Sequence, residues 1–292
     1  MHKKKRNSLN KVGLAIPIVM ILLAILCILP FIHVLAFSLS SPAKANAGLV
    51  TLWPLEFNLD AYRYIMKEPK FIASFWVSIQ RAVLGVSLGC LLTVITAYPL
   101  SKETRSFRTR TAYVWFFVVT MLFSGGLVPT YIIVKTYGLI DSLGALIFPA
   151  ALNVFFVTLM LNFFRGLPLE LEESAVVDGA GQWRILFRIY VLLSLPSLAT
   201  IALFTIVFHW NSWFDGLIYM NKSSHYPLQT YLQTIVTNPD MSRVANIGEV
   251  LAVSSRTVKT AQLFVGMLPV IIVYPFLQRY FVKGMVIGSV KG

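Results

Sequence analysis

Six long stretches without any Asp, Glu, Lys or Arg constrain this 292-residue sequence more than any other feature. They are residues 12–43, 82–101, 111–134, 142–164, 189–214 and 260–278. A helix needs about 20 apolar residues to cross the hydrocarbon core of a bilayer, and each stretch reaches or nearly reaches that length. The sequence therefore predicts an all-α integral membrane protein with six transmembrane helices.

The overall composition agrees with a membrane protein and argues against other classes. Apolar side chains make up 57% of the chain and charged ones only 13%. A net charge of +13 could indicate nucleic-acid binding, but the basic residues are not gathered into a recognition module. We therefore expect the lipid bilayer, and no nucleic acid, as a partner.

The basic residues predict the orientation in the membrane. If the N-terminus is cytoplasmic, the inner segments contain Lys3, Lys4, Lys5, Arg6, Lys11, Lys102, Arg105, Arg108, Arg110, Arg165, Arg184, Arg188, Arg279, Lys283 and Lys291. The outer segments contain fewer Lys and Arg, spread over longer loops. Because cytoplasmic loops are enriched in Lys and Arg, we expect both termini in the cytoplasm.

The N-terminal region allows two interpretations. Residues 1–11 form a basic leader, and the apolar segment that follows could be a signal peptide, since Ala45-Asn46-Ala47 resembles a cleavage site. The hydrophobic region of a cleavable signal has about 7–15 residues, and this one is roughly twice as long. We therefore expect an uncleaved first span, and one transmembrane domain over residues 12–292 with a cytoplasmic tail at 283–292.

The sequence provides no cofactor site of its own. Cys27 and Cys90 lie inside apolar stretches without metal-ligand or disulfide spacing. Neither a phosphate-binding P-loop nor a dinucleotide fingerprint is present in the sequence. If ATP drives this protein, we expect ATP and Mg²⁺ to be bound by a partner chain.

The most charged interior segment runs from Arg165 to Pro196. Pro168 and the acids after it are typical of the first turn of a helix, where the helix dipole favours negative charge. Gly179 and Gly181 end that helix, and apolar residues then recur at helical spacing from Trp183. We call residues 165–192 the elbow and interpret it as a docking site for a partner. The alternative is a solvated loop that only joins two spans.

Two further patterns indicate a transport path. Residues 209–215, His-Trp-Asn-Ser-Trp-Phe-Asp, combine aromatic rings and polar groups, the means by which proteins bind sugar faces and hydroxyls. We assign His209, Trp210, Asn211, Trp213 and Asp215 to a substrate pathway, with Asn153 and Arg81. The alternatives are an interfacial aromatic belt with polar groups bonded between helices and, for Arg81, snorkelling or pairing with a partner subunit.

Arg81 suggests a substrate class. It lies about ten residues into the second span, where a cation that lines an outer cavity would favour an anionic saccharide such as a uronate oligomer. Helix breaks at Ser124-Gly125-Gly126, with Pro129, and a bend near Pro196 would suit helices that alternate between two states.

The elbow resembles the EAA loop of the permease subunits of bacterial ABC importers. The resemblance is carried by Glu173-Ser174-Ala175 and Asp178-Gly179-Ala180-Gly181, with departures at Ser174 and at Val191-Leu192. Residues 124–130, 209–213 and 279–284 resemble the carbohydrate-uptake branch, in particular its oligosaccharide sub-group.

The resemblance implies the type I importer architecture, with Leu167–Tyr190 as a coupling helix pair. The residues expected to couple to an ATPase are Glu172, Glu173, Ser174, Ala175, Asp178, Gly179, Ala180, Trp183 and Phe187. It further implies a bacterial inner-membrane location, a second homologous permease forming a heterodimer, two ATP-binding subunits and an extracytoplasmic solute-binding protein. The chain itself is then not an enzyme. Alternatives are an ABC permease for a peptide, amino acid or anion, and an ion-coupled secondary transporter.

Overall fold

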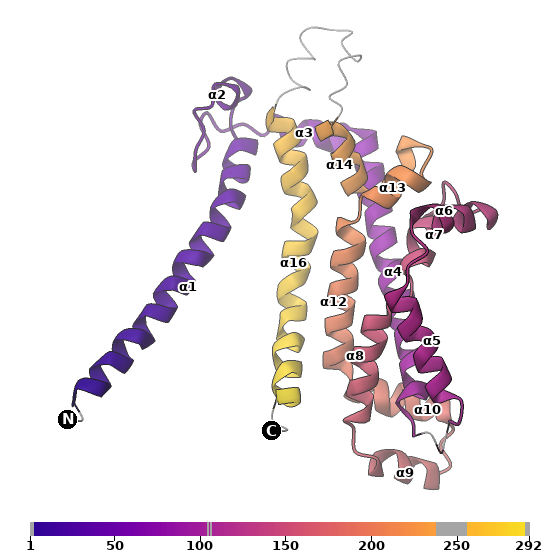
Figure 1. Ribbon diagram of the computed structural model, residues 1–292. Helices are drawn as coiled ribbons and strands as arrows, with labels where there is room; N and C mark the ends of the chain where they lie inside the picture. Colours follow the sequence, from indigo (N-terminus) through magenta and orange to yellow (C-terminus); the bar gives the residue numbers. More distant parts are fainter. Residues whose placement is uncertain (1–2, 104, 106, 238–255, 290–292) are drawn as a thin grey trace. The chain divides into compact units, whose positions relative to one another are not determined.

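The computed structural model describes residues 3–103, 105, 107–237 and 256–289 (Figure 1). These residues form helices and connecting loops, with no β-strand among them. The chain divides into two compact units, one of residues 1–69 and 234–267 and the other of residues 70–233 and 268–292.

The first unit begins with α1 (Lys3–Ser38), followed by the short helices α2 (Pro42–Asn46) and α3 (Asp60–Lys67). Apolar side chains of α1 from Ile16 to Ile28 are exposed within the chain, so the bilayer or another subunit must cover them. Helix α3 starts after Asn58, whose Oδ1 accepts from the N–H of Asp60 at 2.5 Å. The α3 side chain of Tyr62 hydrogen-bonds Ser38 at 2.7 Å.

The second unit contains most of the remaining helices. They are α4 (Pro69–Ser101), α5 (Arg110–Leu122), α6 (Leu127–Thr136), α7 (Leu143–Ile147), η1 (Phe148–Ala150), α8 (Val154–Arg165), α9 (Glu170–Val177), α10 (Gln182–Ile185), the π-helical η2 (Leu186–Tyr190), α11 (Val191–Leu193), α12 (Leu195–Asn211), α13 (Phe214–Tyr219) and η3 (Ser223–His225). Helices α14 (Leu228–Thr237) and α16 (Arg256–Ser289) extend across the boundary between the units.

Three helices are long and apolar enough to cross a membrane, and three bent pairs pass the same test together, so the described residues allow three to six spans. The predicted break at Ser124-Gly125-Gly126 is present, because α5 ends at Leu122 and α6 begins at Leu127 with a bend of 114°. The predicted bend near Pro196 is present as well: α12 begins at Leu195 after a bend of 80°. Pro196 in the first turn of α12 lacks the N–H that would continue the preceding helix.

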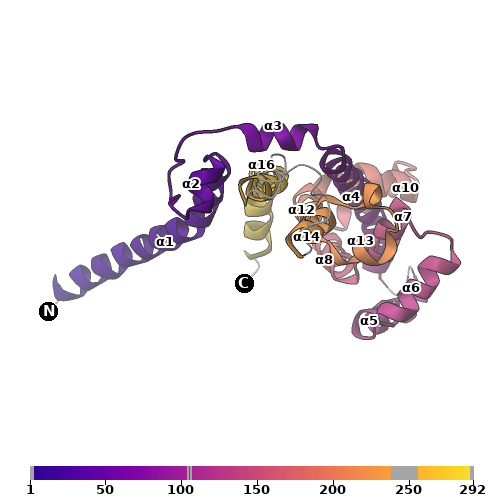
Figure 2. The same cartoon turned by 90° about the horizontal axis from the view of Figure 1, so that it is seen from above.

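Helices α4, α8 and α12 form the body of the second unit and lie side by side in both views (Figures 1 and 2). Gly85 allows α4 to approach α12 closely, because a Cβ on Gly85 would overlap the ring of His209. A Cβ on Gly89 would lie 3.3 Å from the backbone oxygen of Ala151 and 3.6 Å from the Thr205 methyl group, so the tighter contact there is with Ala151. Small residues four apart are a common means of close helix packing in membranes.

The two predicted sites lie at opposite ends of the second unit. The elbow helices α9 and α10 lie at one end, and α6, α7 and α13 lie at the other (Figure 1). A buried apolar cluster that includes Val94, Met160, Phe164 and Ile201 connects α4, α8 and α12 with the elbow. The fold therefore separates the two predicted sites by the length of these helices.

Candidate coupling elbow and substrate pathway

The elbow is two short helices joined by a glycine turn, as its sequence predicts. Gly179 has φ +77°, and its N–H donates to Val176 O at 3.0 Å. The N–H of Ala180 donates to Ala175 O at 2.9 Å. These two bonds define a Schellman cap, which needs a residue in the left-handed region and so favours glycine.

Most of the predicted coupling residues are exposed. They are Glu173, Ser174, Asp178, Gly179, Trp183 and Phe187. Large apolar side chains accompany them, since Leu169, Val176 and Val177 are also exposed, Val177 to 87%. The rings of Trp183 and Phe187 stack with their centroids 6.1 Å apart. A surface of acids and exposed apolar groups is typical of a protein-docking site.

Two predicted coupling residues face the interior instead. Ala175 is buried in the apolar cluster, and the carboxylate of Glu172 is bonded within the chain. Glu172 Oε2 accepts from Lys102 Nζ at 2.5 Å and from the hydroxyl of Tyr190 at 2.5 Å. Glu172 is therefore on the inner face of α9 and its neighbour Glu173 on the outer one, and a contact of Glu172 with an ATPase stays a prediction.

Lys102 belongs to a cluster that sequence reasoning missed. Its ammonium lies over the rings of Tyr98 and Tyr190, 4.1 and 4.5 Å from their centroids. The hydroxyl of Tyr98 donates to Gln182 Oε1 at 2.7 Å. We call Tyr98, Lys102, Glu172, Gln182 and Tyr190 the Lys102 cluster. The spacing of Tyr98 and Lys102, four residues apart at the end of a span, is a signal that could have revealed it.

The residues predicted for a substrate pathway divide into exposed and buried groups. Helix α12 ends at Asn211 and α13 begins at Phe214, so the aromatic and polar stretch contains a helix break. Asn211 and Trp213 are exposed at this break. His209 and Trp210 are buried, and the Trp210 ring packs edge-on against Phe75 with centroids 5.8 Å apart. Trp210 therefore packs as a core residue within the described chain.

Arg81 does not line an open cavity, contrary to the expectation from sequence. Its side chain is 0% exposed and forms an ion pair with Asp215, whose side chain is 27% exposed. One guanidinium nitrogen donates to Asp215 Oδ1 at 3.1 Å and to Ser212 O at 3.3 Å, and the other contacts Asp215 Oδ2. Arg81 thus binds both sides of the helix break, and its charge is balanced inside this chain.

Three buried nitrogen atoms at this site lack hydrogen-bond partners among the described residues. They are Nε of Arg81 itself and both ring nitrogens of His209. Each such atom left unpaired costs about 1–3 kcal/mol of folding free energy, so it requires a compensating reason.

Asn153 has a local role, since its Oδ1 caps α8 by accepting from the N–H of Phe155 at 2.9 Å. That bond uses only the carbonyl oxygen of an exposed amide, so the assignment of Asn153 to the substrate pathway stays a prediction.

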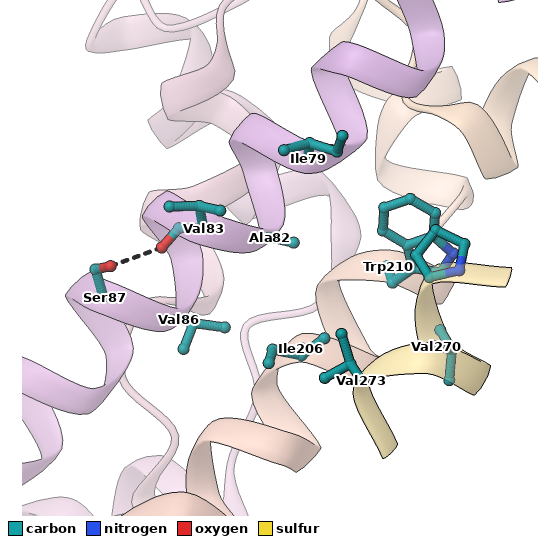
Figure 3. Close-up of a pocket in the computed structure, with 10 residues that line it drawn as sticks. Ile79, Ala82, Val83, Val86, Ser87, Ile206, Trp210, Val270 and Val273 are labelled. Carbon is teal, nitrogen blue, oxygen red and sulfur yellow. Dashed lines mark hydrogen bonds between the residues drawn. The ribbon is translucent and has the colours of Figure 1, made fainter. Parts of the chain in front are cut away.

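An apolar groove of about 370 Å³ lies between α4, α12 and the part of α16 in the same unit (Figure 3). Ile79, Ala82, Val86, Ile206 and Val273 line it. The one hydroxyl in its lining, on Ser87, already donates to Val83 O at 2.8 Å. Trp210, which is predicted for the substrate pathway, also lines this groove, and the other lining side chains apart from Ser87 are apolar.

A second polar contact, also missed from sequence, joins two loops at the end of the unit away from the elbow. Asp141 has φ +62°, and its N–H donates to Tyr219 O at 2.8 Å. Asp141 Oδ1 accepts from the N–H groups of Asn221 and Lys222 at 3.1 and 3.2 Å and lies 3.0 Å from His225 Nδ1. Burial raises the pKa of Asp141, but these hydrogen bonds outweigh it, so that the pKa is below its usual range.

The described residues also provide no group of three or more His, Cys, Asp or Glu that could hold a metal ion. An all-helical membrane chain with broken spans and a two-helix elbow has the architecture of a transport permease. The comparisons with known proteins identify which kind, although no established family profile matches the sequence.

The chain is 40% identical to the polygalacturonan/rhamnogalacturonan transport system permease protein YtcP of Bacillus subtilis, over 94% of this chain and 96% of YtcP. It is 41% identical to protein LplC of the same organism, over 91% of this chain and 90% of LplC. Among solved structures, a chain of a bacterial ABC transporter involved in import of the acidic polysaccharide alginate superposes with a TM-score of 0.86 and 30% identity. That alignment covers 94% of this chain and 98% of the other. The chain belongs to the family of permease subunits of bacterial ABC importers.

Proposed function

We propose that this chain is one half of the translocation path of an ATP-driven importer of oligosaccharides, acidic ones in particular. The observation that carries the proposal is the full-length similarity to permeases whose names specify acidic polysaccharides, polygalacturonan and alginate. The chain makes and breaks no bond in the solute. ATP and Mg²⁺ are bound by two partner subunits.

In this proposal the membrane topology is the one that the basic residues predict. Six spans cross the inner membrane of a bacterium, counting each bent helix pair as one, with both termini and the elbow in the cytoplasm. Residues 12–292 form the permease domain, preceded by the leader at 1–11 and ending in the tail at 283–292. A second, homologous but non-identical permease completes the pore, and a solute-binding protein delivers the saccharide on the opposite side.

The outer surface of the elbow is the proposed contact with the ATPase. Glu173 and Asp178 offer carboxylates, and Val177, Trp183 and Phe187 offer exposed apolar surface. Burying such a surface on a partner is favourable, and the carboxylates give the contact its register. Closure of the ATPase subunits around ATP would then move the elbow and the spans attached to it.

The exposed residues at the helix break, Asn211 and Trp213, are the proposed contacts for the saccharide. An aromatic face packs on the apolar face of a sugar ring, and an amide binds its hydroxyls. An ion-coupled mechanism is disfavoured, because it would need free carboxylates within the spans, and the carboxylate of Asp215 at the helix break is paired with Arg81.

The test is ATP hydrolysis by the complex purified in detergent and returned to lipid, with binding protein present. Oligogalacturonides are expected to raise hydrolysis, and neutral maltooligosaccharides of equal length to raise it less. Failure of any ATP-hydrolysing subunit to purify with the chain would overturn the importer assignment. Equal or stronger stimulation by the neutral sugars would overturn the preference for acidic ones.

A further inference from the structure

The Lys102 cluster lies where the elbow meets the end of α4, and its charged pair, Lys102 and Glu172, is largely shielded from solvent. Lys102 follows the last residue of α4 directly, Glu172 belongs to α9, and Tyr190 ends η2. Three elements that are separate in sequence therefore converge on one ammonium group. Lys102 and Glu172 are 70 residues apart in the chain.

Two hydrogen bonds and two aromatic rings surround the ammonium group of Lys102. Lys102 Nζ donates to Glu172 Oε2 at 2.5 Å and to the hydroxyl of Tyr190 at 3.3 Å. The same nitrogen lies over two tyrosine rings, which attract a cation through their faces. The Tyr98 and Tyr190 rings also pack edge-on against each other, with centroids 5.0 Å apart.

Burial makes this pair stronger than an ordinary surface ion pair. The Lys102 and Glu172 side chains are only 16% and 15% exposed. Desolvation lowers the pKa of Lys102, and its hydrogen bond and charge interaction with Glu172 oppose that shift. Removing one partner of such a pair leaves the other charge buried and uncompensated, which is far more costly than losing an exposed pair.

We propose that the Lys102 cluster is the mechanical link that makes the elbow and α4 move as one rigid body during ATP-driven transport. The inference rests on the proposed function, in which the elbow receives force from an ATPase. It assigns a role to Lys102, Glu172 and Tyr190 as positioning residues. Glu172 transmits motion inward, whereas its neighbour Glu173 contacts the partner.

The geometry explains why a polar link is needed at this point. The elbow continues to α12 through a bend of 80° at Ser194. Its apolar contacts to α4 are non-directional, so they do not by themselves fix the angle between α9 and α4. A cation held by a carboxylate and two ring faces fixes both distance and angle, so the α9–α4 contact stays in one register.

The test measures the distance between spin labels at Glu170→Cys on α9 and Ser87→Cys on α4, in a Cys27→Ala/Cys90→Ala background of the whole complex. A rigid link predicts the same distance in the nucleotide-free and the ATP–vanadate-trapped complex. In Lys102→Met and in Glu172→Gln the distance is expected to broaden or shift between the two states. Lys102→Arg, which keeps the charge and the ring contacts, is expected to restore wild-type behaviour.

A distance that changes with nucleotide in the wild-type complex would overturn the proposal, and so would a fixed distance in Lys102→Met and Glu172→Gln. The matched control is Glu103→Gln, which removes an exposed acid next to Lys102 that has no part in the proposed docking surface and is expected to leave the distance unchanged. Retention of the ATPase by the spin-labelled complex, measured by co-purification, tests docking separately. Loss of the ATPase from every variant and from the wild type would count against the proposed function and not against the link.

Uptake of oligogalacturonides per ATP hydrolysed gives a second readout. Lys102→Met is expected to lower this ratio at least about fivefold, the low end of ordinary coupling between sites. A merely structural role would lower uptake and hydrolysis in proportion, because fewer intact complexes would remain. An unchanged ratio would therefore contradict the proposal.

Discussion

At the scale of single residues, the ion pair of Arg81 and Asp215 is the least expected feature of the chain. It joins α4 to the break between α12 and α13, across 134 residues of sequence. A charge at membrane depth is costly unless it is paired. The pair therefore explains how a fully buried arginine is tolerated.

We expect Arg81→Ala to destabilise the chain by about 3–5 kcal/mol, because Asp215 and Ser212 O would lose their donor. The measurement is thermal or denaturant unfolding in detergent. The matched control is Arg63→Ala, which breaks an exposed pair with Asp60 and should cost less than about 1 kcal/mol. The double variant Arg81→Met/Asp215→Leu should recover much of the loss, since no unpaired charge remains. Equal effects of Arg81→Ala and Arg63→Ala would contradict this account.

At this scale, the sequence alone could not identify contacts between residues that are far apart along the chain. Arg81 could be recognised as a functional or paired residue because a lone cation in an apolar stretch is rare. Its partner could not be identified, since periodicity and motifs report neighbours within a few turns. Asn153 shows a related limit: an amide within an apolar stretch has the same pattern whether it binds a ligand or caps a helix.

At the scale of elements, the sequence predicted helix positions well and helix geometry less well. The break at 124–126 and the bend at Pro196 follow from local backbone chemistry, so glycine and proline reveal them. The size of each bend, 114° and 80°, depends on the packing of other elements. In the elbow, the adjacent acids Glu172 and Glu173 lie on opposite faces of α9. The sequence pattern alone did not show which of the two faces inward.

We expect Gly179→Ala to weaken the Schellman cap by about 1–2 kcal/mol, the cost of a Cβ in the left-handed region. Nothing lies within 4 Å of a Cβ at this position, so the loss comes from the backbone and not from a clash. The measurement is amide hydrogen exchange of α9, which should become faster. The control is Gly181→Ala, at a position with φ −70° and open space around it, which should leave α9 unchanged.

The loop contact at Asp141 predicts a dependence on pH. Because its folded-state pKa is below the ordinary value of about 3.9, the contact stabilises the fold fully above that value and is lost as pH falls through the folded pKa. The measurement is the difference in unfolding temperature between wild type and Asp141→Asn from pH 7 to pH 3. The difference should be constant above about pH 5 and shrink below pH 4. Asparagine tolerates the positive φ, so backbone strain does not complicate the comparison.

At the scale of the whole molecule, the chain is incomplete on its own. Apolar side chains of α1 and of the elbow are exposed, and no described residue provides a nucleotide or metal site of recognisable type. The similarity to importer permeases explains both properties, because such a subunit is surrounded by lipid and partner proteins. The class of protein could be predicted from apolar stretches and one motif, whereas the saccharide could only be approached through relatives.

If the exposed apolar surface of the elbow binds a partner, two of its residues can be changed without loss of folding stability. Val177→Ser/Trp183→Ser should leave the unfolding temperature of the isolated chain unchanged, since both side chains are already in solvent. Burying each on a partner is worth about 1.5–3 kcal/mol, so their loss should weaken ATPase binding by about 100-fold or more. The measurement is affinity for the purified ATPase subunit, with Ile185→Ser as the opposite case: Ile185 is buried, so this variant should lower the unfolding temperature. Unchanged ATPase affinity of the double variant would show that the elbow docks through another face.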